Sequence, residues 1–185
     1  MSSDTQNTSA ALHNLTHNLT HTGLRSKQSA AHDYGVLAAF IIGHQAIAYI
    51  LGIVTRTEIT QWYAGLEKSS LTPPDWVFGL TWAVLFFMIS VSGWLLYKNR
   101  HKKGADTAAV FFGLQLIFNW SWTIVFFSYH LILPAAVWIA GLIILLSATM
   151  LTLRHVSGAA VLWLVPYLLW ISFAFYLNLA IWVLN

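Results

Sequence analysis

Five long apolar stretches follow one another along the chain, and the charged residues gather in the segments between them. Each stretch is long enough to cross about 30 Å of hydrocarbon as an α-helix. Only 8% of the residues are charged and the mean hydropathy is +0.66, which is too apolar for a water-soluble domain of this size. The sequence therefore predicts an all-α integral membrane bundle of five transmembrane helices, near residues 34–55, 76–97, 107–128, 132–153 and 159–183.

The first 30 residues have a different composition, rich in Ser, Thr, Asn, His and Gln. We expect residues 1–30 to form a disordered polar leader and residues 31–185 to form the membrane domain. The leader contains histidines at a spacing of four, His13, His17 and His21. On a helix they would share one face and could bind a transition metal, but a solvated low-complexity tail is the favoured interpretation.

Basic residues indicate how the bundle is oriented in the membrane. One side receives Lys and Arg from the leader and from the second and fourth connections, at positions 25, 27, 98, 100, 102, 103 and 154, whereas the other side receives only Arg56 and Lys68. By the positive-inside rule, the N-terminus is predicted on the cytoplasmic or equivalent side and the C-terminus on the opposite side. Because these residues are scattered over short loops, they do not predict nucleic-acid binding.

Aromatic and amide side chains recur at helical spacing within three of the spans. Amides facing lipid are costly, so we expect these faces to turn inward and to line the interior of the bundle. Such a lining suits a flat, largely apolar ligand, although aromatic packing and interhelical amide hydrogen bonds are the alternative explanation. The residues concerned are Phe78, Trp82, Phe86 and Ile89, then Gln115, Asn119, Trp122 and Phe126, then Trp163, Tyr167, Trp170, Ala174 and Asn178.

Single positions carry further expectations. His44, in the middle of the first span, could ligate haem iron or relay protons, but a hydrogen bond to a neighbouring helix is the favoured interpretation. Asp75 follows Pro74 and is predicted to cap the second span. The long connection 56–75 is predicted to act as a lid or binding segment. The membrane domain contains neither a hydrolytic side-chain triad nor a metal-ligand cluster, so ordinary hydrolytic or phosphoryl chemistry and metal binding are not expected.

Several ordered motifs carry a resemblance to a known family. These are Trp62-Tyr63, Leu66-Glu67-Lys68, Pro73-Pro74 with Trp76-Val77-Phe78-Gly79 and Trp82, Asn119 with Trp122 and Phe126-Phe127, and the run Pro166 to Ala174 with Leu177-Asn178. From about Tyr34 to Asn185 the chain resembles the TspO/MBR family, the tryptophan-rich sensory and translocator proteins. The match departs from the family at Ser69, Leu80 and Ile124, where members often have proline, so the lid and local helix kinks are expected to differ.

The resemblance implies a five-helix bundle, commonly a homodimer through its third helix, that binds porphyrins or haem-like tetrapyrroles and, in many members, sterols and benzodiazepine-type drugs. The porphyrin is then a ligand, and no cofactor is required. By matching position, the implied ligand-binding residues are Trp62, Tyr63, Trp82, Asn119, Trp122, Tyr167, Trp170 and Ala174. Trp82 and Trp170 match the positions that the family associates with light-dependent porphyrin breakdown, the one enzymatic activity that the resemblance implies.

Two functions from different classes follow. The first is a membrane receptor or sensor that binds a tetrapyrrole between its helices. The second is a secondary transporter of aromatic amphipathic compounds, which would be favoured by an acidic residue inside the membrane. All six carboxylates lie in the leader or near span boundaries, which favours the receptor.

Overall fold

The structure, a computed structural model, describes the backbone of residues 3–185 and the side chains of residues 31–185. The predicted disorder of residues 1–30 and the alternative metal site at His13, His17 and His21 lie outside the described side chains and stay predictions. The chain divides into two compact units, Met1–Ala38 and Ala39–Asn185. The second unit contains the C-terminal part of the first helix and all the elements that follow it.

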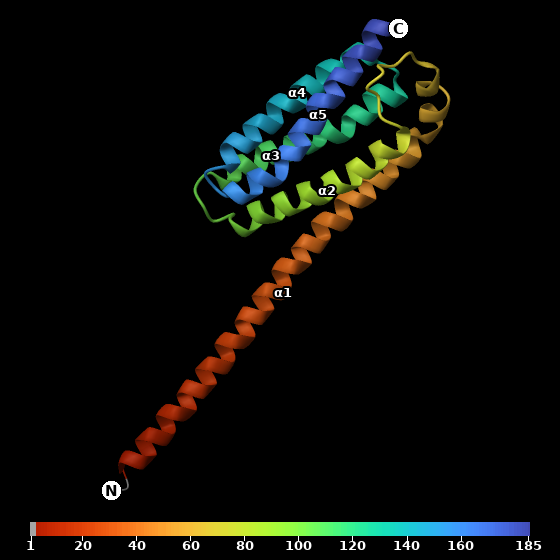
Figure 1. Cartoon of the computed structure of the whole chain (residues 1–185). Coiled ribbons are helices and arrows are strands. Elements are labelled where there is room, and N and C mark those ends of the chain that lie inside the picture. Colours follow the sequence, from red (N-terminus) through yellow and green to blue (C-terminus); the bar gives the residue numbers. More distant parts are fainter. Residues whose placement is uncertain (1–2) are drawn as a thin grey trace. The chain divides into compact units, whose positions relative to one another are not determined.

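The elements are helical throughout the described residues (Figure 1). Five of the helical stretches are long and apolar enough to span a membrane, and they lie within a few residues of the predicted spans. The predicted all-α membrane bundle is therefore confirmed. In order, the elements are α1 (Ser3–Thr60), η1 (Tyr63–Gly65), α2 (Asp75–Lys98), α3 (Ala105–Thr123), the π-helix η2 (Ile124–Ser128), α4 (Ile132–Leu153) and α5 (Gly158–Leu184).

Local sequence explains most of the helix ends. Gly104 precedes α3 with φ 86°, a conformation that costs glycine little. Ser157 caps α5, because its side chain accepts a hydrogen bond from the backbone N–H of Ala160. The predicted capping role of Asp75 is wrong: Pro74 occupies the N-cap position in an extended conformation, and Asp75 is the first residue of α2 without a side-chain cap hydrogen bond. Its carboxylate therefore remains available for other contacts.

The first connection is shorter than predicted, because α1 continues to Thr60 instead of ending near residue 55. Polar side chains at this end of α1 donate hydrogen bonds to backbone carbonyls of the same helix. Thr55 donates to the carbonyl of Leu51 at 2.8 Å, and Thr60 donates to the carbonyl of Thr57 at 3.0 Å. Glu58 also contacts His130, with 2.9 Å between Oε2 and Nε2. The lid loop, as we name residues 61–74, is thus the segment between α1 and α2.

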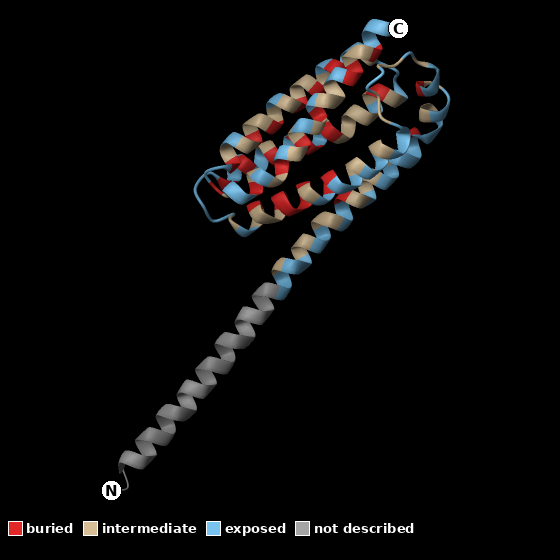
Figure 2. Cartoon of the chain, in the orientation of Figure 1, coloured by how far each residue is buried: buried red, intermediate tan, exposed pale blue. Residues whose placement is uncertain are grey.

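The core of the second unit lies where α2, α3, α4 and α5 face one another (Figure 2). The buried residues include large side chains with no appreciable exposure, among them Ile89, Leu146, Leu164 and Tyr167. The short turn between Ser128 and Ile132 makes α3 and α4 an antiparallel hairpin, as predicted. The α2–α3 and α4–α5 connections lie at one end, since Lys102 donates to the carbonyl of Val156 at 2.9 Å.

Two adjacent side chains attach α1 to α2 within this unit. Nδ1 of His44 lies 2.8 Å from the carbonyl oxygen of Phe40 and 3.0 Å from Oγ of Ser90. The next residue, Gln45, donates from Nε2 to the carbonyl of Ala83 at 2.9 Å. The interhelical hydrogen bond predicted for His44 is therefore confirmed.

Candidate functional site

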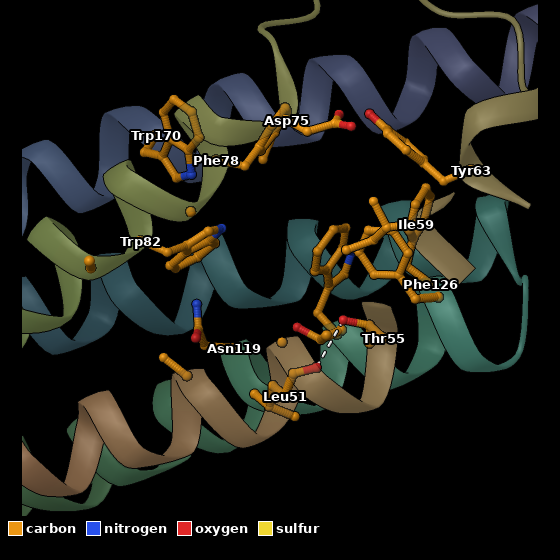
Figure 3. Close-up of a pocket in the computed structure, with 18 of the residues that line it drawn as sticks. Leu51, Thr55, Ile59, Tyr63, Asp75, Phe78, Trp82, Asn119, Phe126 and Trp170 are labelled. Atoms are coloured by element: carbon orange, nitrogen blue, oxygen red, sulfur yellow. Dashed lines mark hydrogen bonds between the residues drawn. The ribbon is translucent and has the colours of Figure 1, made fainter. Parts of the chain in front are cut away.

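A cavity of about 580 Å³ lies between the helices, next to the lid loop. This volume is within the range of pockets that hold drug-sized ligands, about 300–1,000 Å³. Its walls come from α1, α2, α3, η2 and α5, and Tyr63 of η1 closes one end (Figure 3). We refer to it as the aromatic cavity, because its lining includes Phe78, Trp82, Phe86, Trp122, Phe126, Phe127 and Trp170.

The aromatic rings pack against one another as well as around the empty space. Trp82 lies 5.4 Å from Phe86 on its own helix, measured between ring centroids. Trp170 of α5 meets Phe78 of α2 edge to face at 5.7 Å. Such contacts hold each ring in place and contribute about 0.5–1.5 kcal/mol per pair beyond the burial of area. The cavity walls are therefore rigid aromatic surfaces on which a flat ligand can stack.

The π-helix η2 supplies one of these walls. The backbone N–H of Tyr129 donates to the carbonyl of Ile124 at 3.1 Å, the wider hydrogen bond of a π-turn. Phe126 lies within this segment, is 2% exposed and stacks on Trp122 at 5.2 Å. Ile124 begins this π-turn, and the predicted difference from the helix kinks of the family stays a prediction.

Polar groups with unused hydrogen-bonding capacity border the aromatic cavity. Asn178 is 2% exposed, and neither its Oδ1 nor its Nδ2 has a hydrogen-bond partner among the described residues. The indole N–H groups of Trp122 and Trp170 are also buried without partners. A buried polar group without a partner costs about 1–3 kcal/mol, and a ligand with polar atoms on its edge could satisfy these groups.

Six of the eight predicted ligand-binding residues line the aromatic cavity. Trp62 and Tyr167 do not. The Trp62 ring stacks on His130, with 4.2 Å between centroids, and meets Phe126 edge to face at 5.3 Å. It therefore lies behind the part of the cavity wall that Phe126 forms. Tyr167 is fully buried behind Trp82, 6.2 Å away. The six lining residues are Tyr63, Trp82, Asn119, Trp122, Trp170 and Ala174.

Sequence reasoning missed the contribution of α1, which lines the aromatic cavity with Gln45, Ala48, Gly52, Thr55 and Ile59. These residues recur at spacings of three and four, so they share one helix face. They are mostly small or polar residues in an otherwise apolar span, and this pattern could have indicated that α1 lines the cavity. Asp75 was missed because its neighbour Pro74 suggested a capping role.

The lid loop is held against the end of α5. The backbone N–H of Glu67 donates to Oδ1 of Asn185, and Nδ2 of Asn185 donates to the carbonyl of Glu67, both at 3.0 Å. Oγ of Ser69 lies 3.0 Å from the hydroxyl of Tyr176. In this conformation Tyr63 is 8% exposed, and its pKa is raised, chiefly by burial and also by the negative charge of Asp75.

Fold and cavity together define a multi-pass integral membrane protein that encloses an aromatic cavity between its helices. Comparison with known sequences identifies the family of the protein, because residues 37–183 match the TspO/MBR family. The chain belongs to the TspO/MBR family, as the sequence motifs predicted.

Relatives of this sequence occur in archaea, bacteria and animals. The chain is 38% identical to the tryptophan-rich protein TspO of Archaeoglobus fulgidus, over 80% of this chain and 96% of that protein. It is 30% identical to protein CrtK of Rhodobacter capsulatus, over 67% of this chain and 78% of that protein. It is 35% identical to the human translocator protein, over 66% of this chain and 73% of that protein.

Proposed function

We propose that this protein is a membrane receptor that binds a porphyrin or a related flat, largely apolar ligand in the aromatic cavity. The observation that carries the proposal is the cavity of about 580 Å³, bordered by the indoles of Trp82, Trp122 and Trp170. Stacking on indole stabilises a flat ring system, and the unpartnered polar groups of Asn178, Trp122 and Trp170 can meet its polar edge. Membership of a family that includes translocator and tryptophan-rich sensory proteins supports the same function.

The lid loop gives this receptor a second state. Closed, it is hydrogen-bonded to α5 through Asn185 and Tyr176. We propose that it opens to admit the ligand and that a bound ligand favours the closed state, because Tyr63 belongs to both the lid loop and the cavity wall. Breakdown of a bound porphyrin at Trp82 and Trp170 would be an activity of this same site.

The transporter hypothesis gains nothing from the described residues. An acidic residue inside the membrane would favour coupling to a proton gradient. The described carboxylates lie near the ends of the membrane-spanning stretches or in the lid loop, at Asp33, Glu58, Glu67, Asp75 and Asp106.

We propose further that the protein lies with its N-terminus on the cytoplasmic or equivalent side and pairs with a second copy through α3. The basic residues of the α2–α3 and α4–α5 connections, which lie at one end, support the orientation. On α3, Gly113 has open space around its Cα, and the nearby side chains of Val110 and Ile117 are 61% and 57% exposed. A small residue beside apolar side chains allows close helix approach.

Titration with protoporphyrin IX tests the proposed function. The absorbance of the porphyrin is the readout, so the assay does not depend on how many tryptophans a variant retains. We expect saturable binding, and we expect the Trp82→Ala/Trp170→Ala variant to bind about tenfold or more weakly, since aromatic stacking contributes about 1–3 kcal/mol per base-sized ring.

The control is Trp138→Phe. The Trp138 indole stacks on Phe118 at 4.6 Å, away from the cavity lining, so this variant should bind like the wild type. Equal affinity in the double variant and the wild type would place the ligand elsewhere.

A further inference from the structure

Among the described residues, Asp75 is the one charged side chain in the lining of the aromatic cavity. Its position follows from the sequence: Pro74 takes the N-cap, so Asp75 begins α2 and its carboxylate is not used for capping. Within the part of the chain whose side chains are described, the carboxylate forms neither a hydrogen bond nor an ion pair. An exposed, unpaired negative charge therefore lies at the edge of a site whose lining is otherwise uncharged.

Tyr63 lies opposite this carboxylate. Figure 3 shows the phenol of Tyr63 and the carboxylate of Asp75 pointing toward each other at the end of the cavity. Burial and the charge of Asp75 both raise the pKa of the phenol, so it stays neutral and its hydroxyl oxygen can accept a hydrogen bond. A donor on a ligand that reaches this end would thus meet two oxygen acceptors.

The ammonium group of Lys68, in the lid loop, is engaged elsewhere. The ammonium of Lys68 lies 4.7 Å from the centroid of the Tyr63 ring. It donates to the carbonyls of Leu66 at 3.0 Å and Ala64 at 3.3 Å, which hold it on the lid loop. Lys68 neither lines the cavity nor pairs with Asp75. The charge that a bound ligand faces at this end is therefore negative.

We infer that Asp75 and Tyr63 select the polar edge of the ligand, favouring flat aromatic ligands that carry an ammonium or N–H donor over the same ring systems carrying carboxylates. This inference rests on the proposed function, because it concerns the same cavity. The aromatic walls act in the same direction, since the faces of indole and phenol rings attract cations and disfavour anions. A carboxylate near Asp75 is repelled, and the repulsion strengthens as water is excluded.

Three derivatives of one macrocycle test the selectivity. Protoporphyrin IX carries two carboxylates, its dimethyl ester carries no charge at these positions, and its bis(2-aminoethyl)amide carries two ammonium groups. Each is titrated by absorbance into the full chain in a non-ionic detergent at neutral pH. We expect the amine derivative to bind about fivefold to tenfold more tightly than the ester, and the ester more tightly than the acid. Added salt should narrow these differences.

Variants assign the selectivity to Asp75. Asp75→Asn should bring the three affinities to within about twofold of one another, whereas Asp75→Glu, which keeps the charge, should retain the order. Asp106→Asn is the matched control, because Asp106 lies in the first turn of α3 and not in the cavity lining. Circular dichroism and size-exclusion chromatography confirm that each variant is folded.

The outcomes separate the two proposals. If none of the three porphyrins binds saturably, the proposed function fails. If all three bind with equal affinity, or if Asp106→Asn levels the affinities as Asp75→Asn does, the selectivity inference is overturned and the function stands. It is also overturned if the acid binds most tightly and Lys68→Gln removes that preference, because Lys68 would then set the selectivity.

Discussion

Replacing Asn185 by alanine tests whether the lid loop closes the aromatic cavity. The substitution removes both hydrogen bonds between the Asn185 side chain and the backbone of Glu67, each 3.0 Å long. A hydrogen bond contributes about 0.5–1.5 kcal/mol net, and the exposed position favours the lower end of that range, so the two together stabilise the closed lid by about 1 kcal/mol. Because 1.4 kcal/mol corresponds to a factor of ten, we expect a bound porphyrin to leave about fivefold faster.

The assay is stopped-flow release. Protein loaded with protoporphyrin IX is mixed with excess lipid vesicles, which trap the free porphyrin, and recovery of tryptophan emission reports its departure. Adding Tyr176→Phe removes the contact with Ser69 and should accelerate release further. Ser147→Ala is the control, because the Ser147 hydroxyl donates only to the carbonyl of Ile143 on its own helix. An unchanged release rate in the Asn185→Ala/Tyr176→Phe variant would refute the assignment of this loop as a lid.

Three further predictions concern parts of the chain outside the aromatic cavity. Removing residues 1–30 should leave the affinity for protoporphyrin IX unchanged in the absorbance titration, and a collapse of binding would show that the leader is needed. Gly113→Leu should weaken self-association through α3, which analytical ultracentrifugation measures. It should leave ligand affinity intact, because Gly113 has open space around it within the chain. Gly93→Leu should instead destabilise the fold in thermal unfolding, because even a Cβ at Gly93 would lie 3.1 Å from Phe40 and 3.2 Å from Phe112.

Hydropathy and helical periodicity were sufficient to predict the five-helix bundle and which helix faces turn toward its interior. The apolar stretches reveal the spans because lipid accepts few charges. The amides of Gln115, Asn119 and Asn178 indicated the interior, and all three are buried, at 0%, 5% and 2% exposure. One prediction of this kind was incomplete. Trp163 shares the face of Tyr167 by spacing, yet it contacts Phe87 edge to face at 6.3 Å and does not line the cavity.

Features that depend on three-dimensional context were beyond the sequence. The π-turn at Ile124 has no residue signature comparable to proline. The position of the Trp62 ring depends on the ring of His130, on which it stacks. His130 has a φ of 55°, which is unusual for a residue other than glycine, and this φ helps to set the direction of the turn in which His130 lies. The role of Asp75 depends on which of two neighbours becomes the N-cap, a difference of one residue that periodicity does not resolve.

A structure of the chain bound to protoporphyrin IX is the most direct test of the account. We predict that the macrocycle lies in the aromatic cavity, in van der Waals contact with the indoles of Trp82 and Trp170 and with the lid loop still bonded to Asn185. A macrocycle bound on the outer face of the helices, or in contact with neither indole, would contradict the central claim.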